Sequence, residues 1–274
     1  MQLIDTHVMM DSLGVMDLEA MAAAGVRAII SDAAGGMDVA TSSEAAIQYF
    51  ERTLVGETKR AADYFIEVYT ILGINMFAVP PDYEKIIEQL PAYLQREKVV
   101  GVGEIGLEQR SSTCPDLGKQ EAILKSQLEI AREHDKPVVL HLPPGERTKW
   151  IERYLTIIDE VKIDRANVVI THADAATTGM IVESGCVAGI SVLPMRRITP
   201  EDAAKIVADN DINNILISSD TRARHRSDAL GVPRTAVQMK RLGFKDEDIT
   251  KVFYDNPKRI FRLPGSPGNE RTIT

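Results

Sequence analysis

Short apolar runs recur along the chain at regular intervals, and polar residues bound each of them. Uninterrupted runs rich in Val, Ile and Leu are typical of strands that are buried on both faces, as in a parallel sheet. The pattern predicts strands at residues 3–8, 26–31, 66–74, 99–107, 137–142, 168–171, 186–193 and 215–219.

Segments with helical period or composition lie between the predicted strands. They predict helices at residues 17–24, 42–64, 83–96, 119–134, 147–161 and 200–209. Strands that alternate with helices favour a parallel sheet with helical crossovers. The full set of strands matches an α/β fold of the (β/α)8 TIM barrel type, whereas a doubly wound open sheet more often has roughly five to seven strands.

No linker, low-complexity tract or charge block divides the chain. We therefore predict a single domain, a barrel that covers residues 1–263. Residues 264–274 contain Pro and Gly and show no apolar period, which predicts a flexible C-terminal tail.

The composition argues against some classes of protein. Hydrophobic residues make up 44% of the 274 residues, enough for a substantial core. The formal net charge of −8 disfavours a general affinity for nucleic acid or for an anionic membrane, because both require a basic surface. Without a long apolar span or a basic leader, we expect a cytoplasmic protein with no membrane segment. Cys114 and Cys186 lack the spacing of a redox pair or zinc knuckle and are interpreted as ordinary thiols.

Ionisable side chains stand near the ends of several predicted strands. In a parallel barrel the active site forms at the C-terminal ends of the strands. A carboxylate in an apolar run also requires a proton, an opposite charge or a cation. One such histidine alone would equally suit a core imidazole, but a mixed set favours a metal site for zinc, manganese, iron or nickel. The candidate ligands are His7, Glu104, His141, His172 and Asp220.

A competing motif lies in the fourth predicted strand. Residues 101–106 formally satisfy the GxGxxG fingerprint of a dinucleotide site. That fingerprint must lead directly into a helix whose N-terminus faces the pyrophosphate, but here Leu107 continues the apolar run. A carboxylate at Glu104 would also repel phosphate, so we do not expect nucleotide binding by this motif.

The motifs resemble those of TatD-type metal-dependent hydrolases, within the amidohydrolase superfamily. The matching segments are 4–7, 103–108, 219–220 and 256–261, together with His141 and His172 at two strand ends. The resemblance implies a (β/α)8 barrel and hydrolysis, often of phosphodiesters in nucleic acid. It also implies one or two divalent ions, with zinc, manganese, nickel, iron or magnesium as candidates.

Two positions depart from the family pattern. The family begins with His-x-His, whereas this chain has His7 followed by Met9 two residues later, and a thioether is a poor ligand for a borderline divalent ion. Asn75 stands where the family has the imidazole of a Gly-x-His-Pro motif.

The residues that match the family divide into two metal positions. By resemblance, Glu104, His141 and His172 complete one metal position. His7 and Asp220, with Glu104 bridging, leave the other one ligand short. The resemblance therefore favours a single tightly held ion.

The expected mechanism follows from this residue set. A divalent ion held by imidazoles and a carboxylate lowers the pKa of its bound water toward about 7. Asp220 is the predicted base that takes up the proton of this water, and Glu104 and Asp220 are the candidate catalytic residues.

Arginines follow the last two predicted strands and are candidates for substrate binding. Cations at the functional end of an acidic protein suit an anionic substrate, although such side chains can also pair with nearby carboxylates. An aromatic content of 5% offers no run of stacking residues, so nucleic acid is compatible with the sequence but not indicated by its charge. The candidates are Arg196, Arg197, Arg222 and Arg224.

These features predict a metal-dependent hydrolase that acts on an anionic ester, such as a phosphoester in nucleic acid or in a small molecule. An amide or lactone hydrolase of the same superfamily is the first alternative. The second is a barrel that binds a ligand but has lost hydrolysis, because Met9 and Asn75 replace expected imidazoles.

Overall fold

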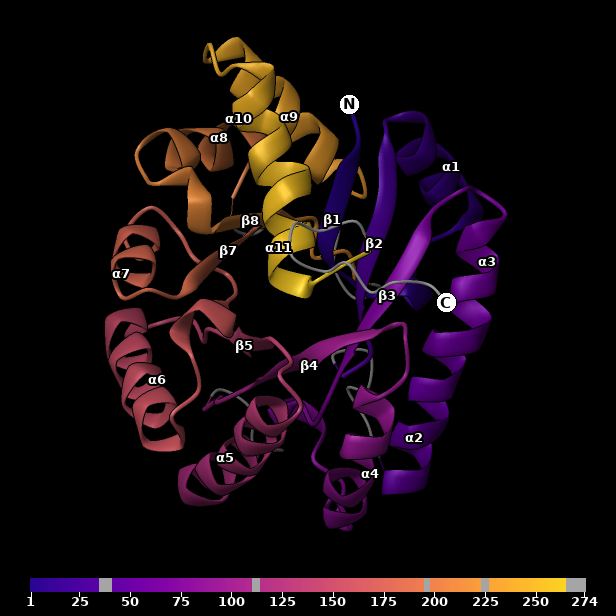
Figure 1. The fold of residues 1–274 in the computed structure, drawn as a ribbon, viewed down its shortest axis with the longest axis vertical. Coiled ribbons are helices and arrows are strands. Elements are labelled where there is room, and N and C mark those ends of the chain that lie inside the picture. The colour runs from indigo at the N-terminus through magenta and orange to yellow at the C-terminus, as the bar shows by residue number, and fades with distance from the viewer. Residues whose placement is uncertain (35–40, 110–113, 195–197, 223–226, 265–274) are drawn as a thin grey trace.

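The computed structural model describes residues 1–34, 41–109, 114–194, 198–222 and 227–264. Within these residues, eight parallel strands form one sheet in the order of the chain, and helices surround it (Figure 1). The strands are β1 (Leu3–Val8), β2 (Val26–Asp32), β3 (Glu67–Leu72), β4 (Val99–Gly106), β5 (Val138–His141), β6 (Val168–Ile170), β7 (Val187–Ser191) and β8 (Ile215–Ser218). The prediction of a single-domain TIM barrel is confirmed.

The helices agree with the predicted ones where the apolar period is long. The prediction for residues 147–161 is confirmed by α6, whereas the predicted helix 42–64 is divided by a wider helical segment at Arg52–Glu57. The helices are α1 (Val15–Ala23), α2 (Ser43–Glu51), α3 (Thr58–Ala62), α4 (Glu84–Leu94), α5 (Leu117–Glu133), α6 (Arg147–Val161), α7 (Thr178–Glu183), α8 (Pro200–Ala208), α9 (Gly231–Arg241), α10 (Asp246–Thr250) and α11 (Asn256–Phe261). In the part of the chain that the structure describes, none of them is both long and apolar enough to span a bilayer.

Backbone and side-chain hydrogen bonds join β1 to β8. Val8 forms a parallel bridge with Thr221, and the backbone N–H of Asp220 donates to the carbonyl of His7 at 3.0 Å. Asp5 Oδ1 accepts from the backbone N–H of Ser219 at 3.0 Å. Burial raises the pKa of Asp5 to about 6, although these hydrogen bonds oppose the rise. The junction places the first and last strands side by side at the end that carries candidate site residues.

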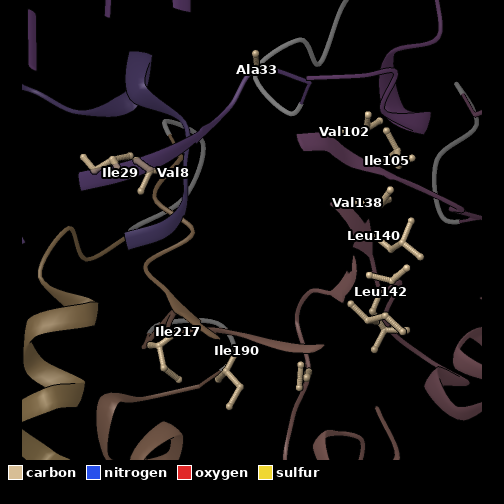
Figure 2. Packing of buried hydrophobic residues seen from close by; sticks show 14 of the residues in the cluster. Val8, Ile29, Ala33, Val102, Ile105, Val138, Leu140, Leu142, Ile190 and Ile217 are labelled. Atoms are coloured by element: carbon tan, nitrogen blue, oxygen red, sulfur yellow. The ribbon is translucent and has the colours of Figure 1, made fainter. Parts of the chain in front are cut away.

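Two apolar layers build the core. The outer layer lies between the strands and the helices, and Figure 2 shows Ile29, Leu140 and Ile217 among its members. The inner layer fills the barrel and includes Ile30 and Val139. Members of the two layers are neighbours in the chain because successive strand residues point to opposite faces.

Along several strands the inward positions change from apolar to polar. Ile30 on β2 belongs to the inner apolar layer, and the next inward position is Asp32. On β5 the corresponding pair is Val139 and His141. The barrel interior is therefore apolar toward the N-terminal ends of the strands and polar toward their C-terminal ends.

The matching segment 256–261 forms α11 and closes the apolar end. The side-chain amide of Asn256 donates to the carbonyls of Ile212 and Ile215 at 2.6 and 3.0 Å. Phe261 and Leu263 belong to the inner apolar layer and are each 2% exposed. The motif therefore has a structural role. Most of the predicted tail, residues 265–274, lies outside the described residues, so its flexibility stays a prediction.

Replacement of Asn256 tests this structural role. Asn256→Ala leaves two carbonyls near the start of β8 without their donor, so we expect the free energy of unfolding to fall by about 1–3 kcal/mol. Urea unfolding would measure the change. Asn213→Ala is the matched control, because Asn213 is exposed and its side chain bonds only to Asp211 within the described residues. Equal losses in both variants would contradict the role assigned to Asn256.

Candidate metal centre

The five predicted ligands converge at the C-terminal ends of the strands. His7 lies on β1, Glu104 on β4 and His141 at the end of β5, while His172 and Asp220 each follow a strand by two residues. All five side chains are buried, with exposed fractions between 1% and 5%. The sequence therefore predicted their convergence correctly, while their roles as ligands remain a prediction.

His172 and Asp220 adopt the left-handed backbone conformation, with φ of 59° and 46°. For residues other than glycine this conformation costs about 1–3 kcal/mol, and it persists only where the surroundings hold it. Arg147 Nη1 donates to the carbonyl of His172 at 2.6 Å, and His7 accepts from the backbone N–H of Asp220. Backbone strain of this kind is concentrated at functional sites in proteins.

Glu104, His141 and His172 form the first group that can hold a metal ion. One donor atom from each lies within 4.8 Å of the others. His172 Nε2 is 3.2 Å from Glu104 Oε1, and His141 Nδ1 is 3.5 Å from Glu104 Oε2. Two imidazoles and one carboxylate are the ligand types that zinc and similar borderline ions accept.

Further polar side chains lie beside the other nitrogen atoms of these imidazoles, and that of Ser191 is within hydrogen-bond distance of His172. His172 Nδ1 lies 2.8 Å from Ser191 Oγ, and His141 Nε2 lies 3.4 Å from Glu108 Oε2. Such partners fix the ring orientation and the tautomer of a ligating histidine. They leave His172 Nε2 and His141 Nδ1 facing Glu104. The sequence analysis included Glu108 in a motif but assigned it no role, and it did not consider Ser191.

A second group consists of His7, Asp32 and Glu104, whose donor atoms also lie within 4.8 Å of one another. The sequence analysis missed Asp32, because the predicted strand ended at residue 31 and the observed β2 ends one residue later. The alternation of Ala28, Ile30 and Asp32 on one face of the strand is the signal that could have identified it. Neither group includes Asp220.

Several hydrogen bonds fix Glu104. Thr171 Oγ1 donates to Glu104 Oε1 at 2.7 Å, and the backbone N–H of Glu104 donates to Asp32 Oδ1 at 3.0 Å. Asn75 Nδ2 donates to the carbonyl of Glu104 at 3.3 Å. Asn75, which stands where the family pattern has an imidazole, therefore binds the backbone of the central carboxylate residue.

Opposite charges determine the ionisation of Glu104 and His7. Burial raises the pKa of Glu104, but His7, His172 and His141 together hold it well below its usual range. Burial lowers the pKa of His7, but the carboxylates of Glu104, Asp32 and Asp220 raise it to about 9. An ionised carboxylate is thus available as a ligand, and a metal ion bound by His7 would displace a proton.

Asp220 forms an ion pair with Arg222. Its Oδ1 accepts from Arg222 Nε at 2.9 Å and from Arg222 Nη2 at 2.6 Å. Burial raises the pKa of Asp220, but the charges of Arg222, His172 and His7 outweigh this and lower it. Arg222 therefore pairs with a nearby carboxylate, which was the alternative to substrate binding for the arginines. Its contact with substrate stays a prediction. Arg196, Arg197 and Arg224 lie outside the described residues.

The GxGxxG segment lies within β4 and does not lead into a helix. A Cβ atom at Gly103 would stand 2.7 Å from Val139 Cβ, so this glycine permits close contact between β4 and β5. Gly106 has φ of 142°, and a Cβ there would stand 2.6 Å from Tyr154 Oη. Tyr154 Oη accepts from the backbone N–H of Leu107 at 2.9 Å and donates to the carbonyl of His141 at 2.5 Å. These glycines serve packing around the site.

Comparisons with known proteins agree with this architecture. The family model described as TatD related DNase matches residues 4–262. An uncharacterised metal-dependent hydrolase of Methanocaldococcus jannaschii is 30% identical over 261 residues, which cover 95% of this chain and 100% of that protein.

Two solved structures have the same fold. A TatD-like protein from Archaeoglobus fulgidus has a TM-score of 0.76 at 25% identity and covers 95% of this chain and 100% of its own. The TatD homologue YjjV from Escherichia coli has a TM-score of 0.70 at 21% identity, with coverage of 96% and 98%. Because the family model spans nearly the whole barrel, and the relative from Methanocaldococcus jannaschii aligns over its full length, the chain belongs to the TatD-related DNase family.

Proposed function

We propose that this protein hydrolyses an anionic ester, most simply a phosphoester, with a divalent ion held by Glu104, His141 and His172. Family membership supports metal-dependent hydrolysis. One observation supports the choice of these three residues as ligands. Their buried donor atoms lie within 4.8 Å of one another.

The donor set fits a divalent ion. Two imidazoles and a carboxylate are provided at the polar end of the barrel. Ser191 orients the His172 ring from outside the group, and Glu108 lies 3.4 Å from His141 Nε2. Zinc, manganese, nickel, iron and magnesium are the candidate ions, and the nitrogen ligands favour the first four. When bound, such an ion polarises the scissile ester and lowers the pKa of a coordinated water to about 7.

Asp220 is the proposed base. The carboxylate is ionised near neutral pH, as a proton acceptor must be, although the charges that lower its pKa also make it a weaker base. Arg222 binds Oδ1, whereas Oδ2 lies 3.7 Å from His172 Nδ1. In the proposed reaction, the water oxygen bonds to phosphorus as the ester bond breaks. Asp220 takes the water proton and returns it to the departing oxygen.

Arg222 places a partly exposed cation beside the base, with part of its charge already offset by Asp220. Arg222 Nη2 lies 4.0 Å from Glu104 Oε2, and the Arg222 side chain is 24% exposed. A substrate oxygen that approaches this guanidinium would bring negative charge to a cation that is partly desolvated. The net charge of −8 argues against a broad nucleic-acid surface, so a small phosphoester or the end of a nucleic acid chain fits best.

Metal content tests the first group. We expect His141→Ala to bind Zn²⁺ at least about tenfold more weakly, because one of the ligands is lost and the supporting contact of Glu108 goes with it. Equilibrium dialysis followed by elemental analysis would measure the affinity. His134→Ala is the matched control, because this histidine ends α5 and contacts the carbonyl of Ile130. Unchanged Zn²⁺ affinity in His141→Ala would refute the group.

Hydrolysis tests the base. For the metal-loaded protein with bis(p-nitrophenyl) phosphate, we expect Asp220→Asn to reduce kcat/KM by about 10² to 10⁴, because general base catalysis is lost. Bound Zn²⁺ should stay at the wild-type amount, since Asp220 is assigned to proton transfer. Wild-type activity in this variant would contradict the assignment.

A panel of substrates separates the proposed function from its alternatives. The ester proposal expects turnover of a phosphodiester or phosphomonoester that exceeds turnover of lactones and dipeptides. Faster turnover of an amide or lactone would replace it with that alternative. No turnover of any class by protein with bound metal would favour a barrel that binds a ligand without hydrolysis.

A further inference from the structure

We propose that Asp32 is a ligand for a second divalent ion, which it binds together with His7 and Glu104. The inference relies on the proposed function only for the first ion. It assigns a metal-binding role to a residue outside the family motifs quoted above, and it replaces the expectation that the second position is one ligand short.

The two oxygens of Asp32 have different surroundings. Oδ1 accepts from the backbone N–H groups of Ala34 at 2.8 Å and Glu104 at 3.0 Å, as expected of a carboxylate that caps the turn after β2. Oδ2 is buried and makes no hydrogen bond within the described part of the chain. Its nearest charged neighbour is His7 Nε2 at 3.4 Å. The turn after β2 therefore explains why Oδ1 is buried. It does not explain the burial of Oδ2.

His7 presents the complementary feature. The side chain is 2% exposed, and neither ring nitrogen makes a hydrogen bond within the residues that the structure describes. Its Nε2 lies 3.4 Å from Asp32 Oδ2, and its Nδ1 lies 3.8 Å from Glu104 Oε1. Buried polar atoms without partners are costly, about 1–3 kcal/mol each. A cation bound among His7, Asp32 and Glu104 would take one ring nitrogen of His7 and the second oxygen of Asp32, and so would satisfy both of these atoms.

The other acidic candidate for this position is already engaged. Asp220 Oδ1 accepts two hydrogen bonds from Arg222, and Asp220 belongs to neither of the two groups that can hold an ion. Met9 is buried and offers only a thioether. Asp32 thus completes a group of donors with His7 and Glu104 in a chain that has a thioether at position 9.

The change of ligand alters the chemistry of the second position. The first group has two imidazoles and one carboxylate, whereas this one has one imidazole and two carboxylates. Carboxylate-rich sites suit harder ions such as Mn²⁺, while imidazole-rich sites suit Zn²⁺. Glu104 belongs to both groups, so it would help to hold both ions, and two-metal sites are common among hydrolytic enzymes.

Asp32→Asn tests the proposal with little disturbance of the fold. The amide oxygen can still accept from Ala34 and Glu104, but Oδ2 becomes an NH2 group that cannot bind a cation. With Mn²⁺ as the probe, we expect two bound ions per chain in the wild type and one in Asp32→Asn. Equilibrium dialysis with elemental analysis gives the stoichiometry. Loss of the spin-coupled electron paramagnetic resonance signal of a bridged Mn²⁺ pair is an independent readout.

Matched variants distinguish the ligands. Met9→Leu and Asp220→Asn should each keep two Mn²⁺ ions, because neither residue is assigned to the second position. If Asp32→Asn does not fold, His7→Gln should show the same loss of one ion.

Three results would overturn the proposal: two ions retained in Asp32→Asn, one ion lost in Asp220→Asn, or only one ion bound by the wild type. The His141→Ala variant shows whether the second ion alone is absent or whether the first group also fails to bind an ion. One ion in the wild type and none in His141→Ala would leave the proposed function standing and remove only the second ion.

Discussion

A carboxylate buried at the polar end of the barrel is the constraint on which the site depends. Glu104 is 1% exposed, and an ionised group without water must be stabilised by charges and hydrogen bonds nearby. Thr171 donates to its side chain, Asn75 and Asp32 hold its backbone, and imidazoles surround it. These neighbours lie on or just after five strands, β1, β2, β3, β5 and β6. The site therefore exists only when the whole sheet is assembled.

The barrel provides this assembly through the alternation of its strands. Ile30 and Val139 face the apolar interior, and two residues later Asp32 and His141 face the site. The same geometry that fills the core also directs the ligands, so no separate framework is needed. The junction of β1 with the segment after β8 then brings His7 next to Asp220, which are more than two hundred residues apart in the chain. Strand order, rather than distance in sequence, determines which side chains can share an ion.

Much of the fold could be predicted from the sequence because buried parallel strands leave uninterrupted apolar runs. The positions of Glu104, His141 and His172 followed from the rule that barrel sites form at strand ends. Asp32 was missed because the same rule was applied to a strand judged one residue too short. The contacts of Ser191 with His172 and of Glu108 with His141 depend on how neighbouring strands align, and no periodicity encodes that. The pairing of Arg222 with Asp220 likewise depends on backbone conformation, since Asp220 is left-handed.

The position of α11 has a consequence for how the protein is made. A chain emerges from the ribosome with its N-terminus first, so all the strands of the described sheet are synthesised before Phe261 and Leu263. Those two side chains fill the apolar end of the barrel together with Ile30 and Val139. Without these two side chains, the apolar end of the barrel would lack part of its hydrophobic cover. The apolar end of the barrel is therefore closed by residues that are synthesised after every strand of the described sheet.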